Sequence, residues 1–330
     1  MTSRPAAGSD LCLEFRAIHE PEPGKRLRTV FNEYWHGYHL WMCKHPGGWP
    51  ALDECRSRLR AHMPELFPVY ESILDLVGHD HDRARFLTLW SPTPIIRACS
   101  QAVISTDTGP VLIRNYDHAP HLCDAIMLST QWGGVRTHVM TDCVWGALDG
   151  VNDAGLTVAL AFGGRRAVGP GFSASLVLRY LLQTCTSVRE ACDTLRRVPV
   201  YMSYNFTMLD RSGAHLTAFA SPDRPLSLDL SPVSTNHQQH IEWPQYAEFT
   251  QSAERRACLS EIVESTATVE QAIDAFLAPP LVRSQYRRAS GTLYTVAYSP
   301  NELAMTLYWR GRSERISPED PRGQSITVHY

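Results

Sequence analysis

The stretch from Ile95 to Tyr116, IIRACSQAVISTDTGPVLIRNY, shows most clearly how this chain folds. Its first part, Ile95 to Thr106, is rich in β-branched and apolar residues and predicts a strand. Thr108, Gly109 and Pro110 are turn residues, and VLIRNY, from Val111 to Tyr116, predicts the returning strand. The stretch therefore predicts a β-hairpin with Cys99 near its beginning.

The sequence beyond this hairpin predicts further strands and helices in separate blocks. The expected strands cover residues 125–130, 135–141, 156–162, 203–209, 215–220, 292–298 and 303–309. The expected helices cover 173–184, 187–198 and 268–276, and capping boxes open the last two at Ser187 with Glu190 and at Thr268 with Gln271. Strands joined by hairpins, with helices in blocks, indicate an α+β fold.

The first ninety residues have a different texture. Aromatic residues and histidines gather between Tyr34 and Trp41, and apolar residues recur at helical spacing from Leu52 to Val77. Pro64 and Pro68 divide that region into more than one expected helix, and residues 78–82 (GHDHD) are expected to form a loop.

Composition narrows the class of protein. The 330 residues have a formal net charge of −3 and show only short basic clusters, which argues against a nucleic-acid partner. Met1 to Phe15 lacks the apolar core of a signal peptide, and no apolar run reaches the ~20 residues of a membrane helix. The nine cysteines are scattered and include no Cys-x-x-Cys pair, so we expect free thiols and a cytoplasmic location without membrane attachment.

Five short motifs in order point further than composition does. They are RACS around Cys99 with RNYD from Arg114 to Asp117, GVNDAGL from Gly150 to Leu156, SVREACDTLRR from Ser187 to Arg197, SYNF from Ser203 to Phe206 followed by DRSG, and TNH from Thr235 to His237. Together they resemble the acyl-coenzyme A:6-aminopenicillanic acid (isopenicillin-N) acyltransferase family of N-terminal-nucleophile cysteine hydrolases. Choloylglycine hydrolases and penicillin V acylases are wider relatives of that family.

The resemblance implies a four-layer αββα sandwich and a chain that cuts itself before its nucleophile. Here the cut would separate Ala98 from Cys99. Residues 1–98 would then form a largely helical segment that stays associated, and residues 99–330 the catalytic part. The family usually has glycine before the cysteine, so Ala98 is a departure that could slow the cut.

The chemistry expected of this site follows from a cysteine at a new N-terminus. The thiolate of Cys99 is the nucleophile and its own α-amino group the general base, because free amines of this kind have a pKa of ~8. By resemblance, Asn152 and Asn205 stabilise the oxyanion, Arg114 and Asp117 border the nucleophile, and a later arginine closes the site, with Arg283 and Arg287 both open.

The reaction expected is cleavage or formation of an amide bond of a small molecule through S-acyl-Cys99. An amine acceptor makes the chain an N-acyltransferase and water makes it an amidase, with acyl-coenzyme A one candidate donor; specialised metabolism is the expected context. No cofactor and no metal are expected.

Plainer interpretations stand beside these. Cys99 fits core packing, Asn152 fits turn chemistry, and Arg114 with Asp117 fits a surface ion pair. His237 fits a structural hydrogen-bonding residue near the pocket, with catalysis a lesser option. Two other functions remain open at this point: a catalytically silent binding protein with the same fold, and a metal-dependent hydrolase using His36 and His39 or His79 and His81.

Overall fold

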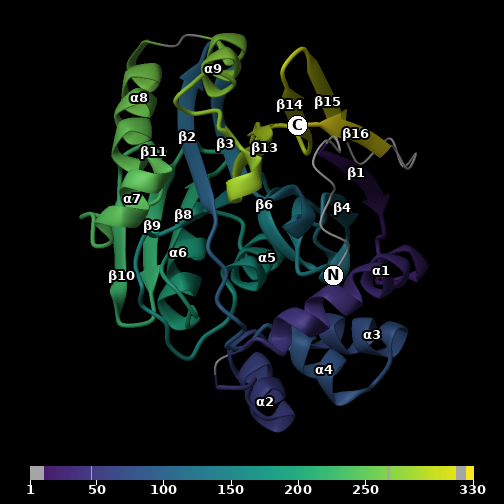
Figure 1. The fold of residues 1–330 in the computed structure, drawn as a ribbon. Coiled ribbons are helices and arrows are strands. Elements are labelled where there is room, and N and C mark those ends of the chain that lie inside the picture. The colour runs from purple at the N-terminus through teal and green to yellow at the C-terminus, as the bar shows by residue number, and fades with distance from the viewer. Residues whose placement is uncertain (1–10, 46, 266–267, 317–324) are drawn as a thin grey trace.

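The computed structural model describes residues 11–45, 47–265, 268–316 and 325–330. Within these residues two β-sheets lie face to face (Figure 1). Across the nine-stranded sheet the order is β10 (Arg224–Asp229), β9 (His215–Ser221), β8 (Tyr204–Leu209), β7 (Thr157–Phe162), β6 (Gly146–Asn152), β5 (Thr137–Asp142), β4 (Ile126–Thr130), β1 (Cys12–His19) and β16 (Ser325–His329). The second sheet has β11 (Val233–Ser234), β2 (Ala98–Thr106), β3 (Gly109–His118), β13 (Ser290–Tyr298), β14 (Met305–Trp309) and β15 (Arg312–Ile316), and β12 (Ser284–Gln285) pairs with β13.

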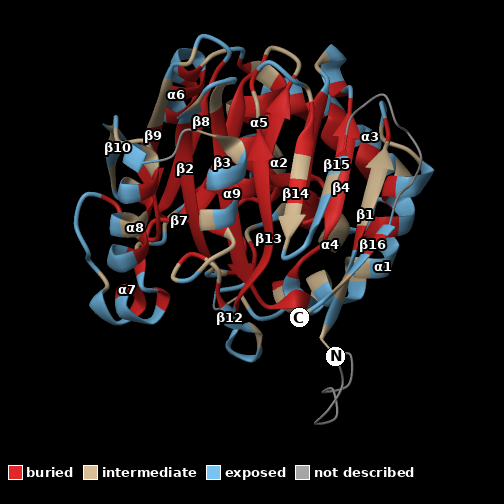
Figure 2. Ribbon diagram, turned by 90° about the horizontal axis from the view of Figure 1, so that it is seen from above, coloured by how far each residue is buried: buried red, intermediate tan, exposed pale blue. Residues whose placement is uncertain are grey.

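Helices cover the outer faces of both sheets. The helices α8 (Ser252–Ser265) and α9 (Val269–Phe276) pack on the sheet that contains β2 and β3, and α7 (Pro244–Thr250) leads into α8. On the other side, α5 (Ala174–Thr184) and α6 (Val188–Arg197) pack on the nine-stranded sheet. Figure 2 shows strands β2, β3 and β13 buried, whereas the helices α8 and α9 have exposed outer faces. The order helix, sheet, sheet, helix confirms the expected α+β sandwich.

The N-terminal region forms a helical group and one strand. Its helices are α1 (Lys25–Met42), α2 (Leu52–His62), α3 (Phe67–Val77) and α4 (His81–Thr88), and they share one hydrophobic core with α5, α6 and the outer face of the nine-stranded sheet. The division of 52–77 into two helices is confirmed. Strand β1 was not expected, and it lies between β4, to which it is parallel, and β16, to which it is antiparallel. The N-terminal region is therefore built into the central sheet.

The hairpin at Cys99 is confirmed, with one boundary changed. β2 begins at Ala98, so Ile95 to Arg97 precede the strand. Side chains along β2 alternate between the two faces of the sheet. Cys99 and Val103 face the nine-stranded sheet, whereas Ala102 and Ile104 face α8 and α9. Cys99 therefore points into the space between the sheets.

Other expectations need correction. Residues 78–82 are not all loop, because Asp80 caps α4 by accepting a hydrogen bond from the Arg83 N–H, and the helix begins at His81. The box at Thr268 is confirmed in both directions. At Ser187 the side chain caps α6. The Glu190 carboxylate, however, accepts from the Thr186 N–H and not from the N-cap residue, so that box is not reciprocal.

Candidate active site around Cys99

The amide nitrogen of Cys99 is held by an asparagine from a neighbouring loop. β11 pairs Ser234 with Gln101, and the chain beyond β11 continues along β2 so that Asn236 comes to lie beside Cys99. The Cys99 N–H donates to Asn236 Oδ1 at 2.9 Å. The amide group of the Ala98–Cys99 peptide is thus oriented by a side chain and not by the sheet ladder.

The loop that carries Asn236 is fixed from several sides. Asn205 Nδ2 donates to the carbonyl oxygens of Thr235 and His237, both at 2.9 Å. His237 Nδ1 lies 2.7 Å from Ser252 Oγ, and burial lowers the pKa of His237 to about 4, so the ring is neutral at pH 7. Gly164, at φ +68°, faces the loop so closely that a Cβ there would lie 2.2 Å from the Asn236 carbonyl oxygen. The loop therefore requires glycine at this position.

The thiol of Cys99 lies beside a buried arginine. Arg114 Nη2 is 3.2 Å from Cys99 Sγ, and Arg114 Nε donates to the Leu160 carbonyl oxygen of β7 across the space between the sheets. Arg114 also pairs with Asp149, which accepts hydrogen bonds from the hydroxyls of Tyr294 and Tyr298. Arg114 is 1% exposed, so this network acts in a dry region where charges are felt strongly.

Two opposing effects set the acidity of the Cys99 thiol. Burial raises the pKa of the thiol, and the Arg114 guanidinium lowers it, with burial the larger effect. Cys99 is 1% exposed. A molecule from solution therefore cannot reach the sulfur in this structure, whereas the adjoining Ala98 carbonyl lies in the same chain and needs no access.

Asp117 lies on the opposite face of its sheet from Arg114. The two residues are three positions apart on β3, and side chains on a strand alternate. Asp117 pairs with Arg255 of α8 at 2.9 Å and accepts from Thr292 Oγ1 at 2.7 Å, and both members of the ion pair are fully buried. Burial raises the pKa of Asp117, against the lowering effect of Arg255. Arg114 and Asp117 thus have separate partners and are not a surface ion pair.

Arg255 joins the two sides of the site. Its Nη2 donates to Asn236 Oδ1 at 2.7 Å, so the same oxygen accepts from Arg255 and from the Cys99 N–H. The chain Asp117, Arg255, Asn236 and Cys99 is therefore one continuous hydrogen-bonded network. Arg255 lies in a helix without a recognisable motif, and the sequence offered no signal for it. Asn236 lies within the TNH motif but was not singled out.

The structure places Asn152 away from Cys99. On β6, Asp149 and Val151 face the second sheet, and Asn152 faces α5. Asn152 Nδ2 donates to the carbonyl oxygens of Leu182 at 2.9 Å and Cys185 at 2.7 Å, and its Oδ1 accepts from the Leu156 N–H at 3.0 Å. The side chain thus binds the end of α5 to the turn that follows β6.

The structure also separates the two late arginines. Arg283 is buried: its backbone N–H donates to Thr292 Oγ1, which in turn donates to Asp117, and its guanidinium donates to the Phe249 and Thr250 carbonyl oxygens. Arg287 is exposed on a short 3-10 helix (η4, Tyr286–Arg288). Geometry therefore brings Arg283 to the border of the site and leaves Arg287 on the surface.

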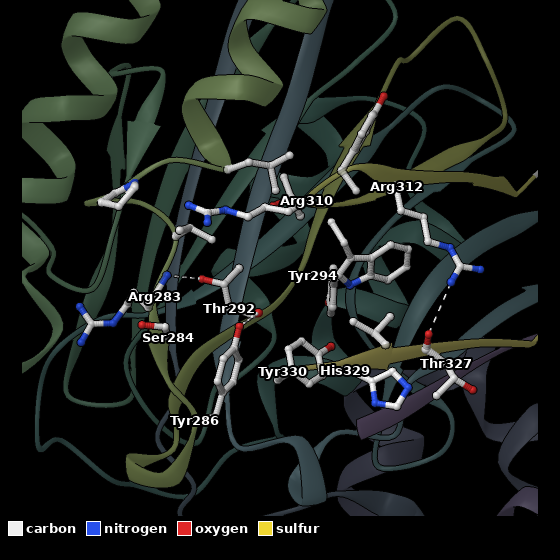
Figure 3. A pocket seen from close by; sticks show the side chains of 17 residues that line it. Arg283, Ser284, Tyr286, Thr292, Tyr294, Arg310, Arg312, Thr327, His329 and Tyr330 are labelled. Carbon is white, nitrogen blue, oxygen red and sulfur yellow. Dashed lines mark hydrogen bonds between the residues drawn. The ribbon is translucent and has the colours of Figure 1, made fainter. Parts of the chain in front are cut away.

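A cavity of about 480 Å³ adjoins this border (Figure 3). Arg283, Thr292 and Tyr294 line it, as Figure 3 shows. Thr292 donates to Asp117, and the Tyr294 hydroxyl accepts from Arg114. Cys99 is not among the lining residues.

The histidines proposed as metal ligands have other neighbours. His39 pairs with Asp82 and His79 with Asp75. Among the residues that the structure describes, no three histidine, cysteine or carboxylate side chains gather in a way that could hold a metal ion. Nor is any helix in the described ranges long and apolar enough to cross a membrane.

Comparison with known proteins gives one family. The sequence profile described as acyl-coenzyme A:6-aminopenicillanic acid acyl-transferase matches residues 104–314, more than half of the chain. The match includes Arg114, Asp117 and Asn236 and begins shortly after Cys99. No curated protein sequence matches the chain.

Similar solved structures include a mutant conjugated bile acid hydrolase from Clostridium perfringens and a penicillin V acylase from Agrobacterium tumefaciens. The first is 12% identical with a TM-score of 0.46, and the similarity covers 70% of this chain and 97% of that one. The second is 13% identical with a TM-score of 0.45, and the similarity covers 66% and 84%.

Proposed function

This chain belongs to the acyl-coenzyme A:6-aminopenicillanic acid acyl-transferase family, and from that premise we propose that it cuts itself before Cys99 and then transfers acyl groups through a thioester on that residue. The observation that carries the proposal is the placement of Cys99. Its sulfur lies 3.2 Å from the Arg114 guanidinium, and its nitrogen 2.9 Å from Asn236 Oδ1.

The cut uses groups already present at the site. Cys99 Sγ attacks the Ala98 carbonyl carbon, the bond from that carbon to the Cys99 nitrogen breaks, and the thiol proton passes to the nitrogen. Water then hydrolyses the thioester and leaves a carboxylate on Ala98 with a free thiol and amine on Cys99. Arg114 favours the attacking thiolate, which is the nucleophilic form of cysteine.

The freed amine becomes the base for later reactions. Asn236 Oδ1, which accepts from the nitrogen in the uncut chain, is positioned to hold it afterwards. The guanidiniums of Arg255 and Arg114 lie on either side and favour the uncharged amine, the form that takes the thiol proton. Asp117, paired with Arg255, keeps this cation in place.

The reaction that follows is acyl transfer from a small-molecule amide or another acyl donor, acyl-coenzyme A among the candidates, to Cys99 and then to an acceptor. An amine acceptor makes the chain an N-acyltransferase and water makes it an amidase. The family supports a role in specialised metabolism. Asn205 acts in this scheme by fixing the Asn236 loop, because its amide hydrogens go to the Thr235 and His237 carbonyls.

The two fragments stay together after the cut. Strand β1 lies within the nine-stranded sheet between β4 and β16, and Phe31, Trp49 and Tyr70 are buried in the core shared with α5 and α6. Burial of a large aromatic side chain stabilises by about 2–3 kcal/mol. Residues 1–98 therefore remain a structural part of the enzyme.

Intact mass spectrometry of freshly purified protein tests the proposal. The cut leaves 98 residues on one side and 232 of the 330 on the other, and 37.1 kDa shared in proportion to length gives about 11 and about 26 kDa. We expect both fragments from the unaltered chain, which should co-elute in gel filtration, and a single 37.1 kDa species from Cys99→Ala.

Cys192→Ala is the matched control, because Cys192 is also buried but lies on α6. It should be cut like the unaltered chain. If the unaltered chain stays whole, the proposal fails and a silent binding protein becomes the better interpretation.

A further inference from the structure

A second, smaller cavity of about 160 Å³ lies next to the peptide that would be cut. Its walls come from α1, from the segment that precedes β2, and from the loops after β3 and β5. Among the twelve described residues that line it are Tyr34, Tyr38, Trp41, Arg97, Asp124 and Asp142. Aromatic side chains and two carboxylates thus surround one arginine.

Arg97 occupies the acidic side of this cavity. Its Nη2 lies 2.6 Å from Asp142 Oδ1, and the two side chains are 9% and 7% exposed. Burial by itself lowers the pKa of Arg97, but Asp142 together with nearby tyrosine and cysteine groups more than offsets this and raises that pKa. Arg97 Nε is buried and has no hydrogen-bond partner among the described residues, so the guanidinium does not use all its donors. Arg97 is thus held by one carboxylate.

The second carboxylate, Asp124, lies beside Asp142. Asp124 accepts hydrogen bonds from the Tyr38 hydroxyl and from the Val144 N–H at 2.8 Å. Burial and the Asp142 charge raise the pKa of Asp124 to about 6. Arg97 is the only arginine or lysine among the twelve lining residues. If it leaves, the cavity keeps both carboxylates and loses its strong cation.

Arg97 lies two residues before Cys99, on the acyl side of the bond that would be cut. In the self-cutting step the Ala98 carbonyl is the acyl group and the Cys99 nitrogen the leaving amine, so Arg97 extends from the acyl side. The cavity is close to the nucleophile, since Cys123, which lines it, belongs to the same buried cluster as Cys99 and Tyr116. The Tyr246 hydroxyl fixes the Arg97 backbone by donating to its carbonyl oxygen at 2.5 Å.

We propose that the Arg97 side chain fills the acyl-binding pocket of the enzyme in the uncut chain, and that the substrate's acyl group carries a guanidinium or ammonium that replaces Arg97 on Asp142 after the cut. This inference rests on the proposed function, because it takes the Ala98–Cys99 peptide as the first acyl substrate. Residues 95–98, freed at their C-terminal end, move aside to open the pocket.

The charge of the pocket explains the preference. A neutral or acidic acyl group would leave Asp142 buried without a cation, which is costly in a region of low dielectric. A cationic group restores the ion pair that Arg97 makes in the uncut chain. The aromatic rings of Tyr34, Tyr38 and Trp41 supply the apolar walls for the chain that connects the cation to the carbonyl.

Three matched amides test the proposal on the processed enzyme: the p-nitroanilides of acetyl-Arg-Ala, acetyl-citrulline-Ala and acetyl-Glu-Ala. Citrulline has nearly the shape of arginine without its charge. We expect kcat/KM for the arginine amide to exceed that for the citrulline amide by at least about tenfold, as loss of a buried ion pair implies. The glutamate amide should be slower still. Asp142→Asn should reduce the arginine preference to within about threefold.

The results distinguish a failure of the cationic acyl group from a failure of the self-cut. Processed enzyme that cleaves all three amides equally, prefers citrulline or glutamate, or cleaves none of them overturns the cationic acyl group and leaves the self-cut and Cys99 intact. A chain that shows no fragments and no turnover overturns both. The comparison of amides uses the unaltered chain, so it stands even if Asp142→Asn does not fold.

Discussion

Two asparagines on the nine-stranded sheet, Asn205 on β8 and Asn152 on β6, have different roles. Asn205 points between the sheets and fixes the loop that carries Asn236, which accepts a hydrogen bond from the Cys99 nitrogen. Asn152 points toward the helices on the outer face and binds the end of α5. The sequence assigned Asn152 and Asn205 the same role in one site, and the sandwich separates them because one faces the second sheet and the other faces helices.

This contrast shows that the order of motifs along the sequence does not determine which face of its sheet a motif residue occupies. Strand side chains alternate, so neighbouring positions such as Val151 and Asn152 serve different layers. The same reasoning separates Arg114 from Asp117 on β3. One is beside the thiol of Cys99, and the other reaches the network around its nitrogen through Arg255.

The largest expected effect is at Asn236. Asn236→Ala removes the oxygen that accepts from the Cys99 N–H and from Arg255, so the peptide to be cut loses its orientation. We expect fragment formation to slow by about 10²–10³-fold, the usual cost of losing one positioned group at a reacting amide. The measurement is the rate of appearance of the two fragments on a denaturing gel.

Asn236→Asp is the matched control, since it keeps an oxygen acceptor at the same reach and should lose much less. If Asn236→Ala is cut at the unaltered rate, Asn236 does not position the peptide for the cut, and its loop would be structural only, as Asn152 is.

The next effect is a pH dependence of the cut, of about tenfold per pH unit for a single titrating nucleophile. Burial raises the pKa of the Cys99 thiol above its ordinary value, so the thiolate is a minor species at neutral pH and its fraction grows as pH rises. The rate should therefore increase from about pH 6 to about pH 9 without levelling off. Stopped samples taken across this range give the profile.

A plateau below about pH 8 would have a specific meaning. It would show that the Arg114 guanidinium outweighs burial and holds the thiol in its ionised form. Circular dichroism at each pH separates this result from loss of the fold.

The sequence predicted the main features of the fold because they depend on local patterns. The hairpin at Cys99, the helices at 174–184 and 188–197 and the capped helix at 269–276 follow from periodicity, turn residues and caps. Strands β1 and β16 escaped prediction. β1 pairs with β16 on one side and with β4 on the other, and no local pattern carries that information because these strands lie far apart in the sequence.

The site divides in the same way. Cys99, Arg114, Asp117 and Asn205 lie close together as the motifs suggested, because all come from strands or from the loop beside them. Arg255 could not be predicted, since its role depends on how α8 packs against β2 and not on its own neighbours in sequence. Asn236 could have been found, because its motif was recognised and only the choice of residue within it was missed.

The smallest expected effect on cutting is at Asn152, and it completes the comparison. Asn152→Ala leaves the Leu182 and Cys185 carbonyls and the Leu156 N–H without their partner, all in buried surroundings. We expect the free energy of unfolding to fall by about 3 kcal/mol while the rate of cutting stays within about twofold. Urea titrations in the Cys99→Ala background measure stability on a chain that cannot be cut, and gels on the single variant measure the rate. A large loss of rate with unchanged stability would place Asn152 in the reaction. A loss of stability with an unchanged rate, compared with the slow cutting of Asn236→Ala, would show that Asn236 acts in the reaction and that Asn152 stabilises the fold.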